Sequence, residues 1–201
     1  MKPKTLILYI ILLIFSPVFW WQFKSANYKN IYSLWKQTPQ FISQKVNNLY
    51  SDQNIDIIKQ LRRLPDNKID RLFYNKATLI GRDLMTALTL TKPQIHFYAG
   101  TGGSDSPPNI EPIPIILLPF AILGMVNLIK NKKYTFLILW LASAIPAQIV
   151  DQYNYAFLFP TALFYIYFST IYISKLKKPY YFIIFYILYS FYLFKRHQLF
   201  I

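Results

Sequence analysis

The chain has 201 residues, of which 54% are hydrophobic and 19% aromatic, whereas only 15% are charged. Ordinary globular chains carry about 25% charged residues, so this composition argues against a water-soluble globule, a disordered tail and a collagen-like fibre. The 22 Lys and Arg residues exceed the 8 Asp and Glu residues, giving a net charge of +14, and the absence of cysteine excludes a disulfide framework, thiolate metal sites and a cysteine nucleophile.

Five apolar runs without a charged residue divide the chain. They are residues 5–21, 113–129, 134–150, 155–174 and 179–194. A helix needs about 20 apolar residues to cross a bilayer, and a backbone inside lipid must satisfy its own hydrogen bonds, which favours helices. The sequence therefore predicts an all-α integral membrane protein with about five transmembrane helices. The predicted parts are an anchor helix in residues 1–22, an extracytoplasmic segment in residues 23–111 and a four-helix transmembrane bundle in residues 112–201.

Lysines at the ends of the apolar runs predict the orientation. They fall in three places, before the first run, between the second and third, and between the fourth and fifth; they are Lys2, Lys4, Lys130, Lys132, Lys133, Lys175, Lys177 and Lys178. Cytoplasmic loops are enriched in Lys and Arg, so we expect a cell-membrane protein with a cytoplasmic N-terminus and residues 23–111 outside. Membrane lipids are then the expected partners, since anionic headgroups attract such lysines. The basic residues form no compact stripe, which argues against a nucleic-acid partner.

The polar segment before the second run carries two helical patterns. Ile55, Ile58, Leu61 and Leu64 recur at three-residue steps, with Asp56 and Lys59 close enough to pair. A second stripe contains Ile69, Leu72, Phe73, Ile80, Leu84 and Leu88, with its start predicted at Asn67 or Lys68. Spacing of this kind is typical of amphipathic helices. We expect these helices to lie on the membrane surface or against the tops of the spans.

Motifs for common enzyme chemistries are missing from the sequence. It contains no His-Glu-x-x-His zinc motif and no Gly-x-Ser-x-Gly elbow, so neither a zinc protease nor an α/β-hydrolase is indicated. The glycine cluster at residues 100–104 lacks the Gly-Lys-Ser/Thr ending of a phosphate-binding loop. No metal site and no cofactor are predicted.

Several short motifs occur in a suggestive order. They are Leu-Phe-Tyr-Asn-Lys at residues 72–76, the stretch at residues 88–100, Ile-Leu-Leu-Pro-Phe-Ala-Ile-Leu-Gly at residues 116–124 and Ala-Ile-Pro-Ala at residues 144–147. This order resembles the C-terminal part of bacterial membrane glycosyltransferases of the C-type fold, relatives of protein O-mannosyltransferases and aminoarabinose transferases. The resemblance covers nearly the whole chain.

The resemblance implies transfer of a sugar from a polyprenyl-phosphate donor. It also implies that Arg82, His96, Asp105 and Asp151 are the outer polar groups to test for contact with donor phosphate or sugar. In the family, the catalytic acid follows the first span, whereas residues 22–50 here contain no Asp or Glu. General-base catalysis needs a positioned carboxylate, so no catalytic residue is assigned and enzymatic activity stays open.

Two functions follow as hypotheses. The first is a multi-pass membrane protein corresponding to the C-terminal half of a polyprenyl-phosphate-sugar glycosyltransferase, which is split, truncated or inactive alone. Its expected partners are a polyprenyl-phosphate-linked sugar and a second multi-span chain that carries the catalytic half. The second is a non-enzymatic membrane scaffold or assembly subunit whose outer segment binds a partner.

Overall fold

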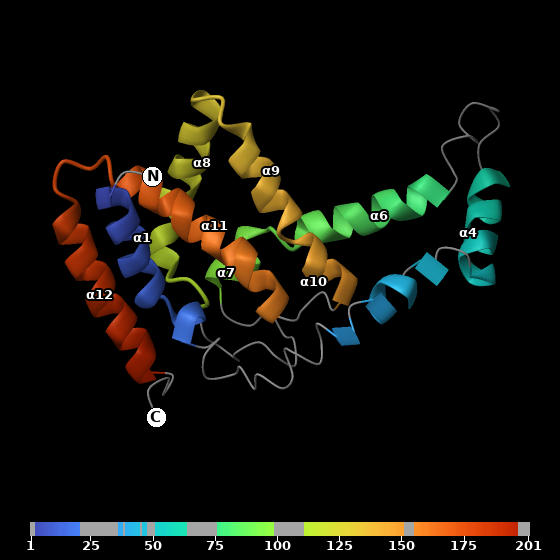
Figure 1. Ribbon diagram of the computed structural model, residues 1–201, viewed down its shortest axis with the longest axis horizontal. Coiled ribbons are helices and arrows are strands. Elements are labelled where there is room, and N and C mark those ends of the chain that lie inside the picture. The colour runs from blue at the N-terminus through green and yellow to red at the C-terminus, as the bar shows by residue number, and fades with distance from the viewer. Residues whose placement is uncertain are drawn as a thin grey trace.

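The computed structural model describes residues 3–20, 36–37, 39–44, 46–47, 51–63, 76–98, 111–150 and 155–196. Figure 1 shows helices gathered into a bundle, with one arm that extends away from it. The helices are α1 (Pro3–Ile14), α4 (Asp52–Arg63), α6 (Lys76–Thr89), α7 (Pro93–Phe97), α8 (Leu118–Lys130), α9 (Tyr134–Ala142), α10 (Ile145–Val150), α11 (Tyr155–Ile173) and α12 (Pro179–Arg196). A 3₁₀ turn over Ile115–Leu117 leads into α8.

Helix α11 forms the centre of the bundle and contacts α1, α8, α9 and α10. Its side chains Ala162, Ile166 and Phe168 have no exposed surface. The contact with α8 is very close, because a Cβ atom at Gly124 would lie 1.9 Å from the backbone oxygen of Phe168. Glycine at this position therefore sets the distance between the two helices.

Two buried tyrosines connect the bundle to more distant segments. The Tyr165 hydroxyl on α11 donates to the carbonyl of Thr91, just before α7. The Tyr186 hydroxyl on α12 donates to the carbonyl of Leu12 on α1 at 2.7 Å. Burial raises the pKa of both phenols, so both stay neutral donors, and each satisfies a carbonyl that would otherwise be costly to bury.

Proline-containing breaks shorten the helices that the apolar runs form. In the first run α1 ends at Ile14 and helical structure resumes at residues 17–20, since Pro17 has no N–H group and restricts the residue before it. The chain turns here, and the backbone N–H of Val18 donates to the carbonyl of Pro112 at 2.8 Å. The third run divides into α9 and α10 at a turn over residues 143–144, just before Pro146. What appears in the sequence as one apolar span is therefore two short helices.

The remaining helices from the apolar runs do not form a membrane-spanning helix either. Helix α8 has 13 residues, α11 has 19 residues with Pro160 inside it, and the 18 residues of α12 end in Lys195 and Arg196. Within the residues that the structure describes, none of the helices is both long and apolar enough to cross a bilayer.

This finding corrects the membrane predictions. The predicted integral membrane fold with five transmembrane helices is wrong. The predicted multi-pass location in the cell membrane, with residues 23–111 outside, is wrong for the same reason. Both predicted functions depended on such spans, so the multi-pass glycosyltransferase half and the membrane scaffold are wrong as well.

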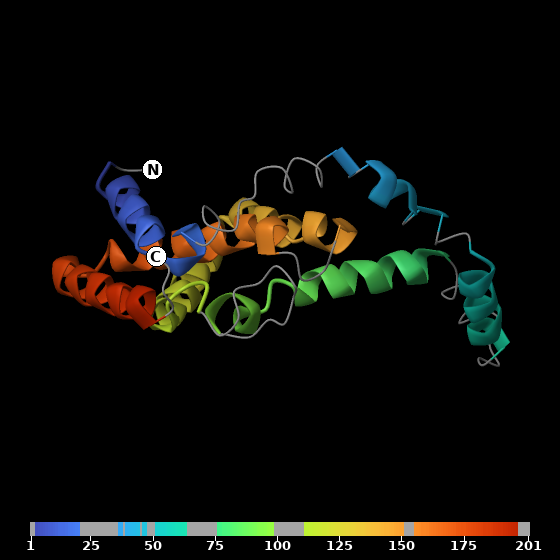
Figure 2. The same cartoon turned by 90° about the horizontal axis from the view of Figure 1, so that it is seen from below.

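The described helices of the polar segment, α4 and α6, form an arm that extends from the bundle. Figure 2 shows α6 leading away from α10, with α4 at the far end of the molecule. The predicted pair on α4 is present, since Lys59 Nζ lies 3.0 Å from Asp56 Oδ1. On α6, Ile80 and Leu84 are exposed, whereas Ala87 near the end of the helix is buried. The expectation that these helices lie against the tops of membrane spans is wrong, because the described residues form no such span. Leu64 of the first stripe and Ile69, Leu72 and Phe73 of the second lie outside the described ranges.

Candidate functional site

His96, a predicted contact for donor phosphate or sugar, lies inside the core. It has no exposed surface, and its ring centroid is 5.1 Å from that of Tyr165. Its Nε2 is 3.0 Å from the carbonyl oxygen of Leu90, so the tautomer with a proton on Nε2 donates there. Burial lowers the pKa of His96 to about 4, against a smaller opposing effect of this hydrogen bond. His96 is therefore a neutral core residue at pH 7.

The other three predicted residues do not join His96 in a common site. Arg82 is exposed on α6, where its Nε is 3.9 Å from Asp83 Oδ1. Asp105 and Asp151 lie outside the described residues. Because Arg82 faces solvent and His96 is buried, no shared surface presents these two groups to a ligand.

A cavity of about 910 Å³ lies elsewhere, where three basic parts of the chain meet. These are the start of α1, the turn between α8 and α9, and the segment that follows α11 (Figure 1). Lys4, Lys133 and Lys175 line it, and none of the described residues that line it is acidic. Three like charges around one cavity repel one another, so this end of the bundle favours a bound anion.

Polar side chains organise the cavity wall. Lys175 Nζ donates to Asn127 Oδ1 at 2.5 Å, which links the segment after α11 to α8. Asn131 Nδ2 donates to the same oxygen at 3.1 Å and to the Asn127 carbonyl at 2.6 Å. Asn127 therefore aligns a lysine and a second amide along one side of the cavity.

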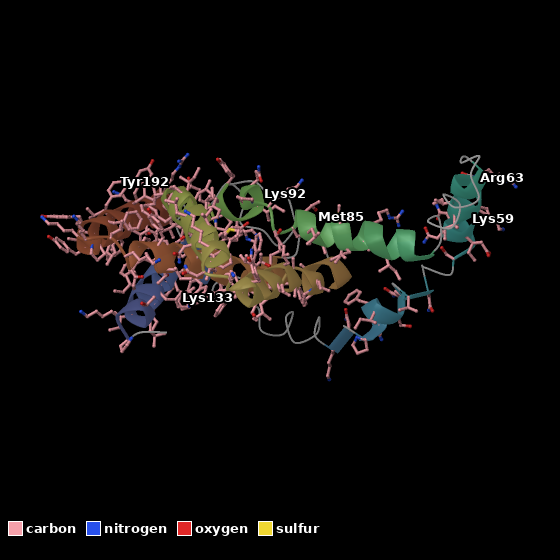
Figure 3. The ribbon with its side chains drawn as sticks, turned by 90° about the horizontal axis from the view of Figure 1, so that it is seen from above. Lys59, Arg63, Met85, Lys92, Lys133 and Tyr192 are labelled. Carbon is pink, nitrogen blue, oxygen red and sulfur yellow. The ribbon has the colours of Figure 1, made fainter. Side chains whose placement is uncertain are left out.

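The end of α8 positions Lys133. Lys132 has a φ of 55°, and its N–H donates to the carbonyl of Ile129 at 3.0 Å, while the N–H of Lys133 donates to that of Leu128 at 2.9 Å. These two bonds and the left-handed residue define a Schellman motif, which terminates the helix. The chain reverses here, and Lys133 (labelled in Figure 3) lies at the start of α9 beside the cavity.

An apolar hollow adjoins the basic cavity. Its volume is about 360 Å³, and it lies between α1, α9 and α11. The lining includes Leu6 and Tyr9 of α1, Phe136 of α9 and Leu163 of α11. Tyr167 lines both the hollow and the cavity, so the basic compartment and the apolar compartment are neighbours.

The outer faces of the bundle helices are apolar too. On α12, Leu188 is 63% exposed whereas Leu193, on the opposite face, is 2% exposed. The exposed stripe of α12 consists of Tyr181, Ile184, Phe185, Leu188, Phe191 and Tyr192. Further exposed apolar side chains lie on α1, α8 and α9. Monomeric proteins rarely expose contiguous apolar patches of more than a few hundred Å², so these faces indicate an apolar partner.

Comparisons with known proteins identify no relative. No family model matches this sequence, and neither a curated protein nor a solved structure is detectably similar to it. The resemblance to C-type-fold glycosyltransferases therefore stays an untested prediction, as do the polyprenyl-phosphate and second-chain partners. In the part of the chain that the structure describes, no group of three or more acidic or histidine side chains could hold a metal ion.

The sequence contained a signal for the basic cavity. Its three lysine groups predict a membrane orientation, and they also predict one common basic end if the apolar helices pack together. Asn127 and Tyr167 could not be chosen from the sequence, because their roles depend on which helix faces pack against each other. Only the structure shows that both line the same cavity.

Proposed function

We propose that this protein binds anionic lipid surfaces through the outer apolar faces of its helices and its lysine-rich end. The lysine-rich end consists of Lys4, Lys130, Lys132, Lys133, Lys175, Lys177 and Lys178. No helix has to cross a bilayer for this function, because an apolar helix face can lie in the interface between headgroups and acyl chains.

The exposed stripe of α12 is the observation that supports this proposal most strongly. Its residues recur at steps of three and four, so they form one continuous outward face. The lysines at positions 175, 177 and 178 precede this face directly. Lys178 Nζ lies 5.9 Å from the ring centroid of Tyr181 at the start of the stripe. Apolar side chains bordered by tyrosine and lysine are typical of helices at a lipid–water interface.

Charge distinguishes lipid from a purely apolar protein partner. The segments that hold these lysines, residues 2–5, 130–134 and 174–180, contain no Asp or Glu, and each Lys near an anionic membrane surface contributes about 1 kcal/mol of attraction. A second copy of this chain would bring the same positive charges together, which opposes association at that end. Anionic lipid therefore fits both the apolar and the basic parts of the surface.

Flotation with vesicles tests this function. The variant carries Ile184→Ser, Phe185→Ser and Leu188→Ser, and the matched control carries Ile80→Ser, Leu84→Ser and Met85→Ser on the exposed face of α6. Burying each α12 side chain contributes about 1.5 kcal/mol or more. We therefore expect the α12 variant to bind vesicles containing phosphatidylglycerol about 100-fold or more weakly, while the α6 variant binds as the unmodified chain does.

Other outcomes would count against lipid binding by this face. If the α12 variant binds vesicles like the unmodified chain but changes from an oligomer to a monomer, the stripe contacts a second copy. Equal losses in the α12 and α6 variants would mean that the face of α12 has no special role. Far-ultraviolet circular dichroism of each variant checks that the helices are retained.

A further inference from the structure

We propose that the lysine cavity and the apolar hollow that adjoins it form one binding site for a single phosphorylated lipid. The phosphate would lie among Lys4, Lys133 and Lys175, and the hydrocarbon chain would lie along α11 in the hollow. This inference rests on the proposed lipid-binding function and adds a discrete site to it, with one lipid per protein molecule.

The cavity has the chemistry of a phosphate site. Lysine binds phosphate as a point charge with three N–H donors, and three lysines reach this cavity from three separate parts of the chain. Asn131 and Ser174 also line the cavity, and their side-chain donors are bonded to oxygens of Asn127 and Ile171, which leaves the lysines as the groups that would bind phosphate. A dianionic phosphate monoester would offset most of the repulsion among the lysines, whereas a neutral headgroup would offset none.

The hollow has the chemistry of a hydrocarbon site. Leu6, Phe136, Leu163 and Phe164 line it. Between Pro160 and Tyr167 the helix rises by about 10 Å, which gives the length of wall available to a chain. The cavity and the hollow each have a volume within the range of about 300–1,000 Å³ that small-molecule sites occupy.

The adjacency of the two compartments points to one amphiphile. Along α1, Lys4 and Thr5 line the cavity, and Leu6 and Tyr9 line the hollow that follows. Along α11, Tyr167 borders both compartments. A free phosphate would leave the hollow empty, and a fatty chain without phosphate would leave the lysines unpaired with an anion. A lipid that carries a phosphate uses both.

Native mass spectrometry of the full chain in a neutral detergent tests the site. The probe is oleoyl lysophosphatidic acid, which has one acyl chain and one phosphate monoester. Lysophosphatidylcholine, oleate and inorganic phosphate are the comparison ligands. We expect one bound lysophosphatidic acid per chain and binding at least about 10-fold weaker for each comparison ligand, since each lacks the dianionic phosphate or the chain.

Two lysine variants of equal net charge distinguish binding in the cavity from general electrostatic attraction to the protein. The first carries Lys4→Gln, Lys133→Gln and Lys175→Gln; the matched control carries Lys36→Gln, Lys59→Gln and Lys92→Gln, which are exposed outside the lysine-rich end and do not line the cavity. The first should weaken binding of lysophosphatidic acid at least about 30-fold, and the control less than about threefold. Leu6→Trp, at an exposed position in the hollow, should weaken binding of lysophosphatidic acid but not binding of inorganic phosphate.

Several results would overturn the site. Equal effects of the two lysine variants would mean general charge attraction, and equal binding of inorganic phosphate would mean a plain anion site. Tight binding of oleate would mean an apolar site without phosphate recognition. If 1:1 binding is absent but vesicle binding still depends on the α12 stripe, only the discrete site fails; if both are absent, lipid binding itself fails.

Discussion

Gly124 shows how one residue sets the distance between two helices. A methyl group there would meet the backbone of Phe168, which cannot rotate away, so α8 and α11 would have to separate. We expect Gly124→Ala to destabilise the fold by about 1–3 kcal/mol or more, measured as a lower midpoint of thermal unfolding. Gly81→Ala on α6 is the matched control, because a Cβ there meets nothing within 4 Å.

The two alanine variants should change the stability in opposite directions, or Gly81→Ala should leave it unchanged. Alanine favours a helix interior over glycine by about 0.5–1 kcal/mol, so Gly81→Ala should raise the stability of α6 or leave it unchanged. A Gly124→Ala protein as stable as the unmodified chain would show that the close contact of α8 with α11 does not hold the bundle together.

His96 should make stability depend on pH. Its pKa falls from 6.5 to about 4 on folding, so the unfolded chain binds more protons between these values. The free energy of unfolding should therefore decrease as pH falls from about 6.5 to about 4, by at most about 3 kcal/mol. Urea unfolding at several pH values measures this change.

His96→Gln provides the comparison for the pH experiment. Glutamine can still donate one N–H to the Leu90 carbonyl but does not titrate. The variant should lose most of the pH dependence between 6.5 and 4. If its stability falls with pH as steeply as that of the unmodified chain, then His96 is not the buried base that the structure describes.

At the scale of elements, the sequence predicted helix positions better than helix lengths. Apolar runs without charge mark α1, α8, α9, α11 and α12 correctly as helical, because apolar periodicity and absence of charge are local properties. The helix ends depend on hydrogen bonds to distant residues. Ser16 Oγ, for instance, donates to the carbonyl of Pro112 at 3.1 Å, which stabilises the break at Pro17, and nothing near residue 16 in the sequence indicates that partner.

The dependence on distant residues also explains why the candidate site could not be predicted from the sequence. His96 and Arg82 are recognisable in the sequence as polar residues, but burial decides what a polar residue does, and burial depends on the packing of distant helices. His96 is buried by Tyr165, nearly seventy positions away in the sequence. Lys133 and Lys175 were visible as charges, yet their shared cavity requires the close packing of α8 on α11.

At the scale of the whole molecule, the bundle and the arm carry different surfaces. Figure 3 shows Lys59 and Arg63 of α4 at the far end from Tyr192 of α12. The bundle thus combines exposed apolar helix faces with a lysine-rich end, and the arm of α6 and α4 carries separate charges away from it. Such a molecule can turn its bundle toward lipid while the arm stays in water.

Flotation of the unmodified chain with vesicles tests the lipid-binding account most directly. One set of vesicles contains phosphatidylcholine alone, and the other also contains phosphatidylglycerol. The chain should float with the anionic vesicles at low salt, float less with the neutral ones, and lose part of its preference at about 1 M salt, where charges are screened beyond about 3 Å. A chain that stays unbound with both sets, or binds both equally at every salt concentration, would contradict the account.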